Sequence, residues 1–196
     1  MEVVRHTPHA PPRMVEEVAQ IQRLVHDQAA GVRELMQRVT PLDLAPGQLV
    51  DVLRDTVNKF WLETGIVTSF TSQVEGPLPS SRTCQELVRI LQEALVNVRK
   101  HSGAQTVSVQ MVSQDAAWRL VISDDGRGFD FSGRLSQAEL DSFGKGPRVI
   151  KDRVRSIGGE LTIESAPDRG ARLEIAIPQA QKAGSKSLNR ERVASG

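Results

Sequence analysis

The chain has 196 residues, with 25 Lys and Arg against 24 Asp and Glu, a net charge of +1, one cysteine and no tyrosine. This length fits one domain of about 150 residues plus a further helix or tails, with a core that needs no disulfide or metal. The near-neutral charge excludes a broad nucleic-acid-binding surface, and the apolar runs are far shorter than the roughly 18 residues that cross a bilayer. Since the single Cys84 has no intramolecular partner, which is typical of a reducing compartment, we expect a cytoplasmic protein that does not insert into a membrane.

Residues 1–12 contain three prolines and two histidines without periodicity, and we expect them to form a disordered lead-in. Residues 13–43 predict a long helix, because a heptad-spaced seam with a single polar member runs along them. The seam consists of Val15, Val18, Gln22, Val25, Ala29, Val32, Met36 and Val39. It indicates either a helix packed on its own domain or, as we favour, a helix that joins a second copy in a homodimer or bundle.

Downstream, the hydrophobic pattern alternates between the periods of helices and strands. The expected elements are a helix at 46–64, a strand at 66–71, a helix at 83–101, strands at 106–111 and 118–122, a helix at 147–157, and strands at 160–164 and 172–177. The apolar stripe of the helix expected at 46–64 consists of Leu49, Val50, Leu53, Val57, Phe60 and Trp61. Residues 125–145, rich in Gly, Ser and Asp, predict a long loop of the lid or disordered kind, and residues 180–196 predict a disordered polar tail.

This order of elements favours a single domain over residues 46–179. Helices that accompany a largely antiparallel sheet cover one of its faces, which makes an α/β (α+β) two-layer sandwich rather than a doubly wound sheet.

Polar residues share one stripe of the helix expected at 83–101. Glu93, Asn97 and His101 follow one another at intervals of four with Lys100 beside them, roughly a third of a turn from the apolar stripe. The residues alone leave two interpretations open, a solvated charged face and a functional site.

Two glycine motifs follow. Asp124-Asp125-Gly126-Arg127-Gly128 comes directly after a strand, where the glycines allow close approach of the backbone to a ligand and a carboxylate can accept from an exocyclic amine. Gly144-Lys145-Gly146 precedes a helix, whose N-terminus with nearby amides suits a phosphate. A plain turn and a flexible hinge are the alternatives for the two motifs.

Taken together, these motifs resemble those of the GHKL ATPase superfamily. The segment 86–104 resembles its N-box, 124–129 its G1 box and 143–146 the start of its G2 box. Downstream, Arg153-Val154, Gly158-Gly159, the run Glu164 to Gly170 and Ile177-Pro178 are similar to the NarL-type subgroup of bacterial sensor histidine kinases. The motifs occur in the expected order over about residues 47–178, and their joint occurrence makes the resemblance specific.

The resemblance implies a Bergerat fold, a mixed sheet with helices on one face, which holds ATP with Mg²⁺ under a mobile lid. It implies that Asn97 coordinates the Mg²⁺, that Glu93 orients or deprotonates the phosphoryl acceptor, and that Lys100 and His101 stand near the phosphates.

The resemblance also assigns roles to the glycine motifs. Asp124 would accept from the adenine amino group, and Gly126 and Gly128 would let the backbone pass the purine. Gly144 and Gly146 would hinge the lid over residues 129–145, with Lys145 at the phosphate site.

The chain departs from the subgroup at Pro147, Val149 and Ala171, where Leu, Gly and Thr are usual. The proline removes one amide that could donate to phosphate, and Ala171 removes a hydroxyl near the nucleotide. The motif His26-Asp27 resembles a phosphoacceptor, but too few residues separate it from Pro41 for a second hairpin helix. We therefore expect His26 to be an ordinary helix histidine on part of a dimerisation hairpin.

The expected function is transfer of the ATP γ-phosphoryl group to a histidine on a helix hairpin, for relay to a response regulator. The hairpin phosphoacceptor domain would come from a longer chain or from a partner. Two alternatives stay open: a GHKL serine kinase of the anti-sigma type, and a degenerate, non-catalytic module that binds ATP or dimerises.

Overall fold

The computed structural model of the chain describes residues 44–114 and 116–179. Contacts divide the chain into residues 1–42 and 43–196, and the described residues all belong to the second unit. The expectations for the lead-in at 1–12, the helix at 13–43 with His26, and the tail at 180–196 lie outside the described residues.

The described residues form helices and strands in nearly the expected order. The helical elements are a 3₁₀ turn η2 (Pro46–Gln48), α2 (Leu49–Thr64), α3 (Ser81–Asn97), a π turn η3 (Val98–Ser102), α4 (Gln137–Ser142) and α5 (Arg148–Ser156). The strands are β1 (Val67–Gln73), β2 (Thr106–Gln114), β3 (Ala117–Asp124), β4 (Gly133–Ser136), β5 (Glu160–Ser165) and β6 (Ala171–Pro178).

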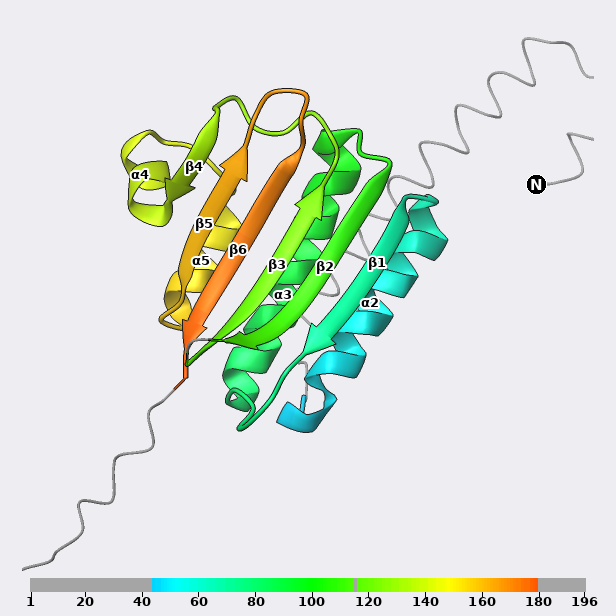
Figure 1. The fold of residues 1–196 in the computed structure, drawn as a ribbon, viewed down its shortest axis with the longest axis vertical. Helices are drawn as coiled ribbons and strands as arrows, with labels where there is room; N and C mark the ends of the chain where they lie inside the picture. Colours follow the sequence, from blue (N-terminus) through cyan, green and yellow to red (C-terminus); the bar gives the residue numbers. More distant parts are fainter. Residues whose placement is uncertain (1–43, 115, 180–196) are drawn as a thin grey trace, which may run out of the picture. The chain divides into compact units, whose positions relative to one another are not determined.

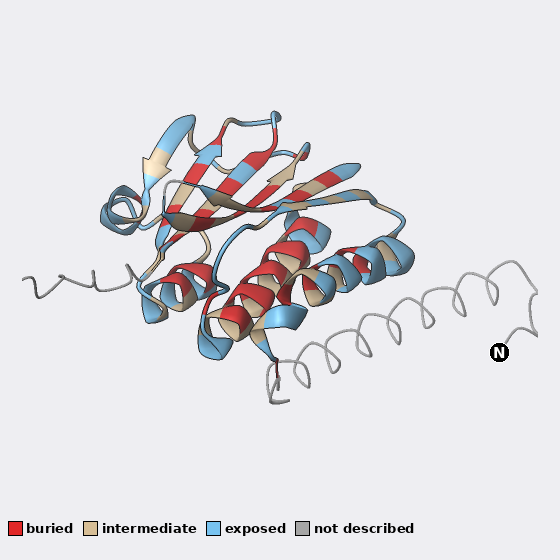
Figure 2. Ribbon diagram, turned by 60° about the horizontal axis from the view of Figure 1, so that its bottom comes forward, coloured by how far each residue is buried: buried red, intermediate tan, exposed pale blue. Residues whose placement is uncertain are grey.

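The strands make one mixed sheet in the order β1-β2-β3-β6-β5-β4. Only β1 and β2 are parallel among these pairs, and α3 makes the long crossover that a parallel pair needs. Helices α2, α3 and α5 cover one face of this sheet (Figures 1 and 2). The expected two-layer sandwich with a mostly antiparallel sheet is therefore confirmed.

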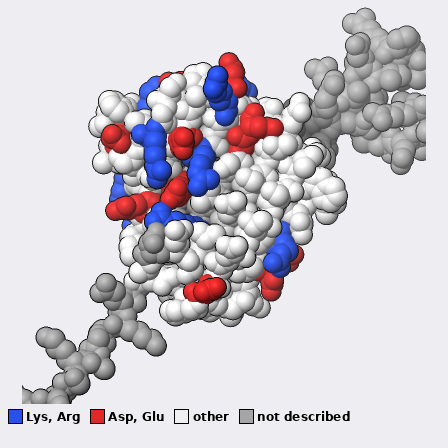
Figure 3. Space-filling model, viewed as in Figure 1, with Lys and Arg blue, Asp and Glu red and all other residues white. Residues whose placement is uncertain are grey.

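The core lies between the sheet and these helices. Every second residue of β2, β3 and β6 is buried against α3 and its neighbours, as the period of a half-covered strand requires. These residues are Val107, Val109, Met111, Leu120, Ile122, Leu173, Ile175 and Ile177. The other face carries side chains such as Glu174, with Arg119 at 2.6 Å and Arg172 at 3.7 Å. Figure 3 views this face and shows the charges gathered on its β4–β6 side.

One aromatic residue expected in the core is not buried. Trp61 belongs to the apolar stripe expected for α2, but it is 50% exposed, whereas Phe60 is 7% exposed. Successive helix residues turn by about 100°, and only one of two adjacent aromatic side chains can face the sheet.

The expected long loop at 125–145 is wrong in its second half. Residues 133–136 form β4, which pairs with β5, and residues 137–142 form α4. Each element is short and has one sizeable aliphatic anchor, Leu135 or Leu140, so neither produces a periodic signal that a sequence pattern can reveal. The second half of the expected lid segment is thus a short edge strand followed by a short helix (Figure 1).

Candidate functional site

A pocket of about 370 Å³ lies where the end of α3, the end of β3 and the start of β6 meet. The sheet register explains this meeting, because Asp124 on β3 pairs with Val107 on β2 and with Ala171 on β6. Its size is within the range of about 300 to 1,000 Å³ of small-molecule sites. The lining residues are Ala94, Asn97, Val98, His101, Ser102, Ile122, Asp124, Arg127, Gly128, Phe129, Gly146, Pro147, Ala171 and Leu173.

The end of α3 supplies one wall. Asn97 is the last α-helical residue, and the π turn η3 carries His101 into the lining. Such π turns are rare in proteins, and those that do occur are often found at functional sites. Glu93 is half-buried and Lys100 exposed, and neither belongs to the lining. The structure thus brings Asn97 and His101 together, whereas the roles expected for Glu93 and Lys100 stay predictions.

The end of β3 carries two adjacent aspartates whose side chains lie in different environments. Asp124 lines the pocket, and its Oδ1 accepts a hydrogen bond of 2.9 Å from the Gly126 amide. The exposed Asp125 points elsewhere: its Oδ1 accepts from the amides of Gln105 at 2.8 Å and Thr106 at 2.9 Å, at the start of β2. Asp124 is therefore the carboxylate available to a ligand, and Asp125 is a structural acceptor.

The two carboxyl groups also differ in acidity. Burial raises the pKa of Asp124 above its ordinary value of 3.8, and the nearby charge of Asp125 raises that pKa further. The hydrogen bond from the Gly126 amide lowers it, but by less than burial raises it. The hydrogen bonds from the backbone of Thr106 and Gln105 lower the pKa of Asp125. A raised pKa in a pocket is typical of a carboxyl group whose charged form is destabilised by burial until a bound ligand supplies a partner.

The glycines around Asp124 are required by the chain itself. A Cβ at Gly126 would lie 2.5 Å from the carbonyl oxygen of Ser102, and one at Gly128 would lie 2.5 Å from that of Ala166. Gly170, at φ 75°, is packed so closely that a Cβ would overlap the carbonyl oxygen of Asp124. Gly128 lines the pocket and Gly126 does not; the expected passage of a purine along both stays a prediction.

The second glycine motif only partly reaches the pocket. Gly146 is in the lining, but Gly144 and Lys145 are not. The amide of Gly144 donates to the backbone carbonyl oxygen of Asp141 at 3.2 Å, and the amide of Lys145 donates to that of Leu140 at 2.8 Å. Both amides therefore complete the hydrogen bonding at the end of α4. The Lys145 ammonium pairs with Asp130. The phosphate role expected for Gly144 and Lys145 stays a prediction.

Two of the three unusual residues face the same pocket. Pro147 is the N-cap of α5 and lies in the lining, as does Ala171, whereas Val149 is 37% exposed and outside it. Sequence reasoning did not single out Arg127 or Phe129 as site residues. The sequence feature that could have indicated them is their position, since Arg127 lies within the glycine motif at 124–128 and Phe129 follows it directly.

The donors of this pocket fit a magnesium nucleotide. In residues 44–114 and 116–179, no three His, Cys, Asp or Glu side chains gather as a metal site. A Mg²⁺ ion prefers oxygen ligands and keeps several waters beside substrate phosphates, so the side-chain oxygen of Asn97 is compatible with it, and this role stays a prediction. Within the same described part of the chain, no helix is long and apolar enough to span a bilayer.

Sequence comparison identifies the class. Residues 84–181, which are 98 of the 196, match the family described as histidine kinase-, DNA gyrase B- and HSP90-like ATPases. The chain belongs to this family, and the expected GHKL membership is confirmed.

The curated relatives are bacterial sensor kinases. The chain is 30% identical to the histidine-protein kinase/phosphatase DegS of Brevibacillus brevis over 84% of its length, covering 41% of that protein. It is 26% identical to the sensor protein VraS of Staphylococcus aureus and to the sensor histidine kinase LiaS of Bacillus subtilis, over 91% and 90% of its length. The chain spans less than half the length of these relatives, since it covers 49% of VraS and 47% of LiaS.

Solved structures agree on the fold. The histidine kinase domain of a blue-light activated kinase from Erythrobacter litoralis EL346 superposes with a TM-score of 0.55 at 19% identity, over 84% of this chain and 88% of that chain. The ATP-binding domain of PrrB from Mycobacterium tuberculosis gives a TM-score of 0.51 at 24% identity, over 67% and 93%.

Proposed function

We propose that residues 46–179 are the ATP-binding catalytic domain of a two-component sensor histidine kinase. The observation that carries this proposal is the pocket itself. The amide of Asn97, the imidazole of His101 and the carboxylate of Asp124 line one cavity, although Asp124 lies more than twenty residues after the other two in the sequence. Its other wall is formed by Gly146 and the start of α5.

The walls suit the two ends of a nucleotide. Asp124 accepts from the adenine amino group and thereby selects the base. Asn97 would hold Mg²⁺ through its side-chain oxygen, and the ion would supply positive charge against the phosphates. His101 lies on the same wall and interacts with the phosphates, and Lys100, directly before it, adds positive charge to the approach.

Phosphoryl transfer depends mostly on position and charge, so this chain's residues act chiefly by holding the nucleotide and excluding water. Glu93 precedes Asn97 by one helical turn, and we assign it to the acceptor histidine, whose proton it orients or accepts, directly or through one water. That histidine belongs to a helix hairpin of a longer chain or of a partner, and the phosphoryl group passes on to a response regulator. The dimer contact expected for residues 13–43 stays a prediction, because these residues lie outside the described part of the chain.

A non-catalytic ATP-binding module is the second candidate. It is favoured by the position of Pro147 and Ala171 in the pocket lining, because one removes an amide donor and the other a hydroxyl at the places where phosphates are expected.

A transfer assay separates these functions. The chain is mixed with Mg²⁺ and γ-labelled ATP, alone and with an isolated hairpin domain from a sensor kinase. Acid-labile, alkali-stable label on the hairpin is the expected result. Acid-stable label on a protein substrate indicates a serine kinase of the anti-sigma type, and binding without transfer to any partner indicates the non-catalytic module.

Asn97→Ala tests the magnesium ligand. We expect the affinity for ATP in Mg²⁺ to fall by about tenfold or more, since a bond to a charged group is lost, and to become nearly independent of Mg²⁺. Isothermal calorimetry with and without EDTA measures this. The control is Asn58→Ala, the same change at an exposed position of α2, which leaves the affinity unchanged.

A further inference from the structure

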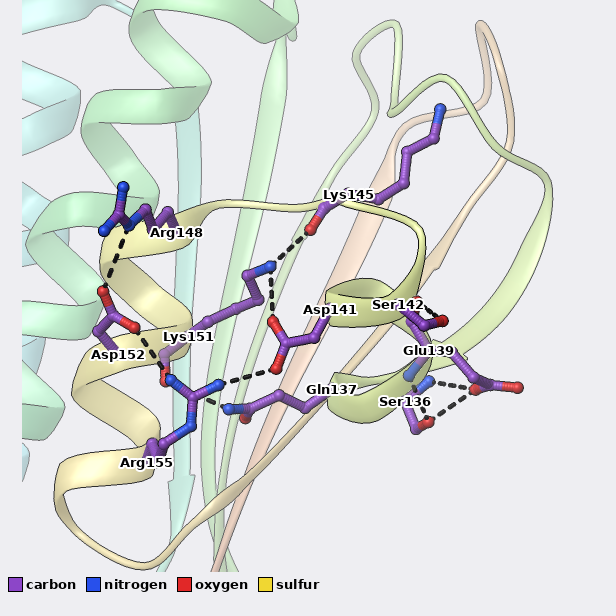
Figure 4. Close-up of polar contacts among 10 residues, drawn as sticks. All are labelled: Ser136, Gln137, Glu139, Asp141, Ser142, Lys145, Arg148, Lys151, Asp152 and Arg155. Atoms are coloured by element: carbon purple, nitrogen blue, oxygen red, sulfur yellow. Dashed lines mark hydrogen bonds and ion pairs between the residues drawn. The ribbon is translucent and has the colours of Figure 1, made fainter.

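Helix α5 carries a lysine whose charge is nearly removed from solvent. The Lys151 side chain is 10% exposed, and burying an ammonium group costs free energy unless partners compensate it. Its Nζ lies 2.8 Å from Asp141 Oδ1 and donates to the carbonyl oxygen of Lys145 at 2.9 Å. Figure 4 shows both contacts converging on the one ammonium group.

The two partners lie in different parts of the lid segment. Asp141 belongs to α4, and Lys145 stands between the two glycines of the second motif, directly before Gly146. Gly146 lines the pocket. Lys151 therefore fastens both α4 and the glycine loop to α5, the helix whose N-cap, Pro147, also lines the pocket.

Other contacts in this region hold α4 without reaching the loop. Arg155 Nη2 lies 2.8 Å from Asp141 Oδ2 and its other nitrogen 3.0 Å from Asp152, but the Arg155 side chain is 56% exposed (Figure 4). Exposed pairs contribute little because water and salt screen them. Among the cations labelled in Figure 4, Lys151 is the one that is both buried from water and bonded to two parts of the chain, Asp141 on α4 and the carbonyl oxygen of Lys145 in the loop.

We propose that Lys151 is a positioning residue that holds α4 and the loop Gly144–Gly146 at the rim of the pocket and so sets the rate at which a bound nucleotide leaves. This rests on the proposed function. Nucleotide release requires this rim to move, and motion of a lid frequently sets the exit rate rather than the chemistry. The glycines at φ 64° and 76° are the backbone positions where such movement is cheapest.

Lys151→Met is the decisive variant, because methionine keeps the length of the stem and removes the charge. With a fluorescent ATP analogue and Mg²⁺ in stopped flow, we expect the dissociation rate to rise about tenfold while the association rate changes by less than about twofold. Amide exchange should rise in residues 137–146 and stay unchanged in β2 and β3. The matched control, Lys59→Met, removes an exposed lysine that pairs with Glu63 at 3.9 Å on α2, and should leave the rates unchanged.

A double-variant cycle distinguishes positioning from general destabilisation. Asp141→Asn should also speed release. The two effects should be less than additive in the double variant, because both single variants remove the contact between Lys151 and Asp141, whereas only Lys151→Met removes the bond to the Lys145 carbonyl oxygen. Additive effects, or an unchanged dissociation rate in both single variants, would overturn the proposal. If Lys151→Met does not fold, Asp141→Asn alone is tested against Lys59→Met.

The proposed function can fail separately. If the wild-type chain does not bind the analogue, ATP binding is wrong, and exchange in the nucleotide-free protein then decides whether Lys151 holds α4. Exchange in residues 137–146 that is unaffected by Lys151→Met would refute the positioning role.

Discussion

Asp124 and Asp125 are neighbours with opposite tasks. The strand period sends the side chain of Asp124 to the helix-covered face, into the pocket, and that of Asp125 past the strand end to the amides of Gln105 and Thr106. Burial raises the first pKa and backbone donors lower the second. The same substitution at these two adjacent positions therefore separates an effect on ligand binding, expected at Asp124, from an effect on stability, expected at Asp125.

Asp124→Asn should stabilise the protein and impair its binding. The folded pKa of Asp124 lies above 3.8, so the folded state retains its proton when the unfolded chain has lost it, and wild-type stability falls as pH rises through that range. Asparagine keeps the acceptor for Gly126 but has no such penalty, and the variant should be the more stable at pH 7 and equal to wild type at low pH. Its affinity for ATP should fall about 10- to 100-fold, with weaker discrimination against GTP.

Asp125→Asn should do the reverse. Because the folded pKa of Asp125 is lowered, its charge stabilises the protein above pH 3.8, and that contribution disappears as pH falls through the folded pKa. The variant should therefore lose stability at pH 7 and keep its affinity for ATP. Urea unfolding from pH 3 to 7 and calorimetry measure both variants; retained discrimination of ATP from GTP in Asp124→Asn would contradict the assignment of the adenine contact.

At the scale of elements, the turn between β5 and β6 determines where the pocket carboxylate lies. Gly170 begins the approach to β6 with φ 75°, and its carbonyl oxygen accepts from Ser165 at 2.9 Å. The absence of a side chain there allows the turn to lie directly against the backbone of Asp124. The end of β3 is thus held in place by Gly170, which follows Asp124 by 46 residues in the chain.

Gly170→Ala should cost about 3 kcal/mol or more, since overpacking adds about 1 to 3 kcal/mol to a left-handed strain of about 1 to 2 kcal/mol. Gly158→Ala is the matched control: Gly158 has φ 65° and nothing near its Cβ, so that variant should cost only the strain. Urea denaturation of both variants measures the difference. Equal losses would mean that the turn can move away from Asp124.

At the scale of the whole molecule, the pocket lies where several helices and strands of the fold meet. It is walled by α3, β3, β6 and the start of α5, with the lid segment at its rim. A ligand that binds there stabilises the folded state as a unit.

MgATP at a hundred times its dissociation constant should therefore stabilise the chain by about 2.7 kcal/mol, which raises the melting temperature by about 5 to 10 °C for a protein of this size. Asn97→Ala should shift much less at the same concentration, and Asn58→Ala as much as wild type. Scanning calorimetry measures the shifts. A wild-type melting temperature that does not respond to MgATP would contradict nucleotide binding.

Much of this protein was determined by local sequence. The helix of α3 and the alternating strands β2 and β3 follow from apolar periods of 3.6 and 2, which are properties of neighbouring residues. The order of the polar motifs predicted the family, which the match over residues 84–181 confirms.

The tertiary structure decided what depends on distant neighbours. Which of two aspartates enters the pocket, why Gly170 cannot carry a side chain, and that Lys151 is buried against Asp141 all follow from contacts between separate elements. The helix α4 and strand β4 belong here too, because segments of four and six residues are stabilised by packing on β5 rather than by their own pattern. Periodicity reports the direction of a side chain, but the close approach of two chain segments exists only after folding.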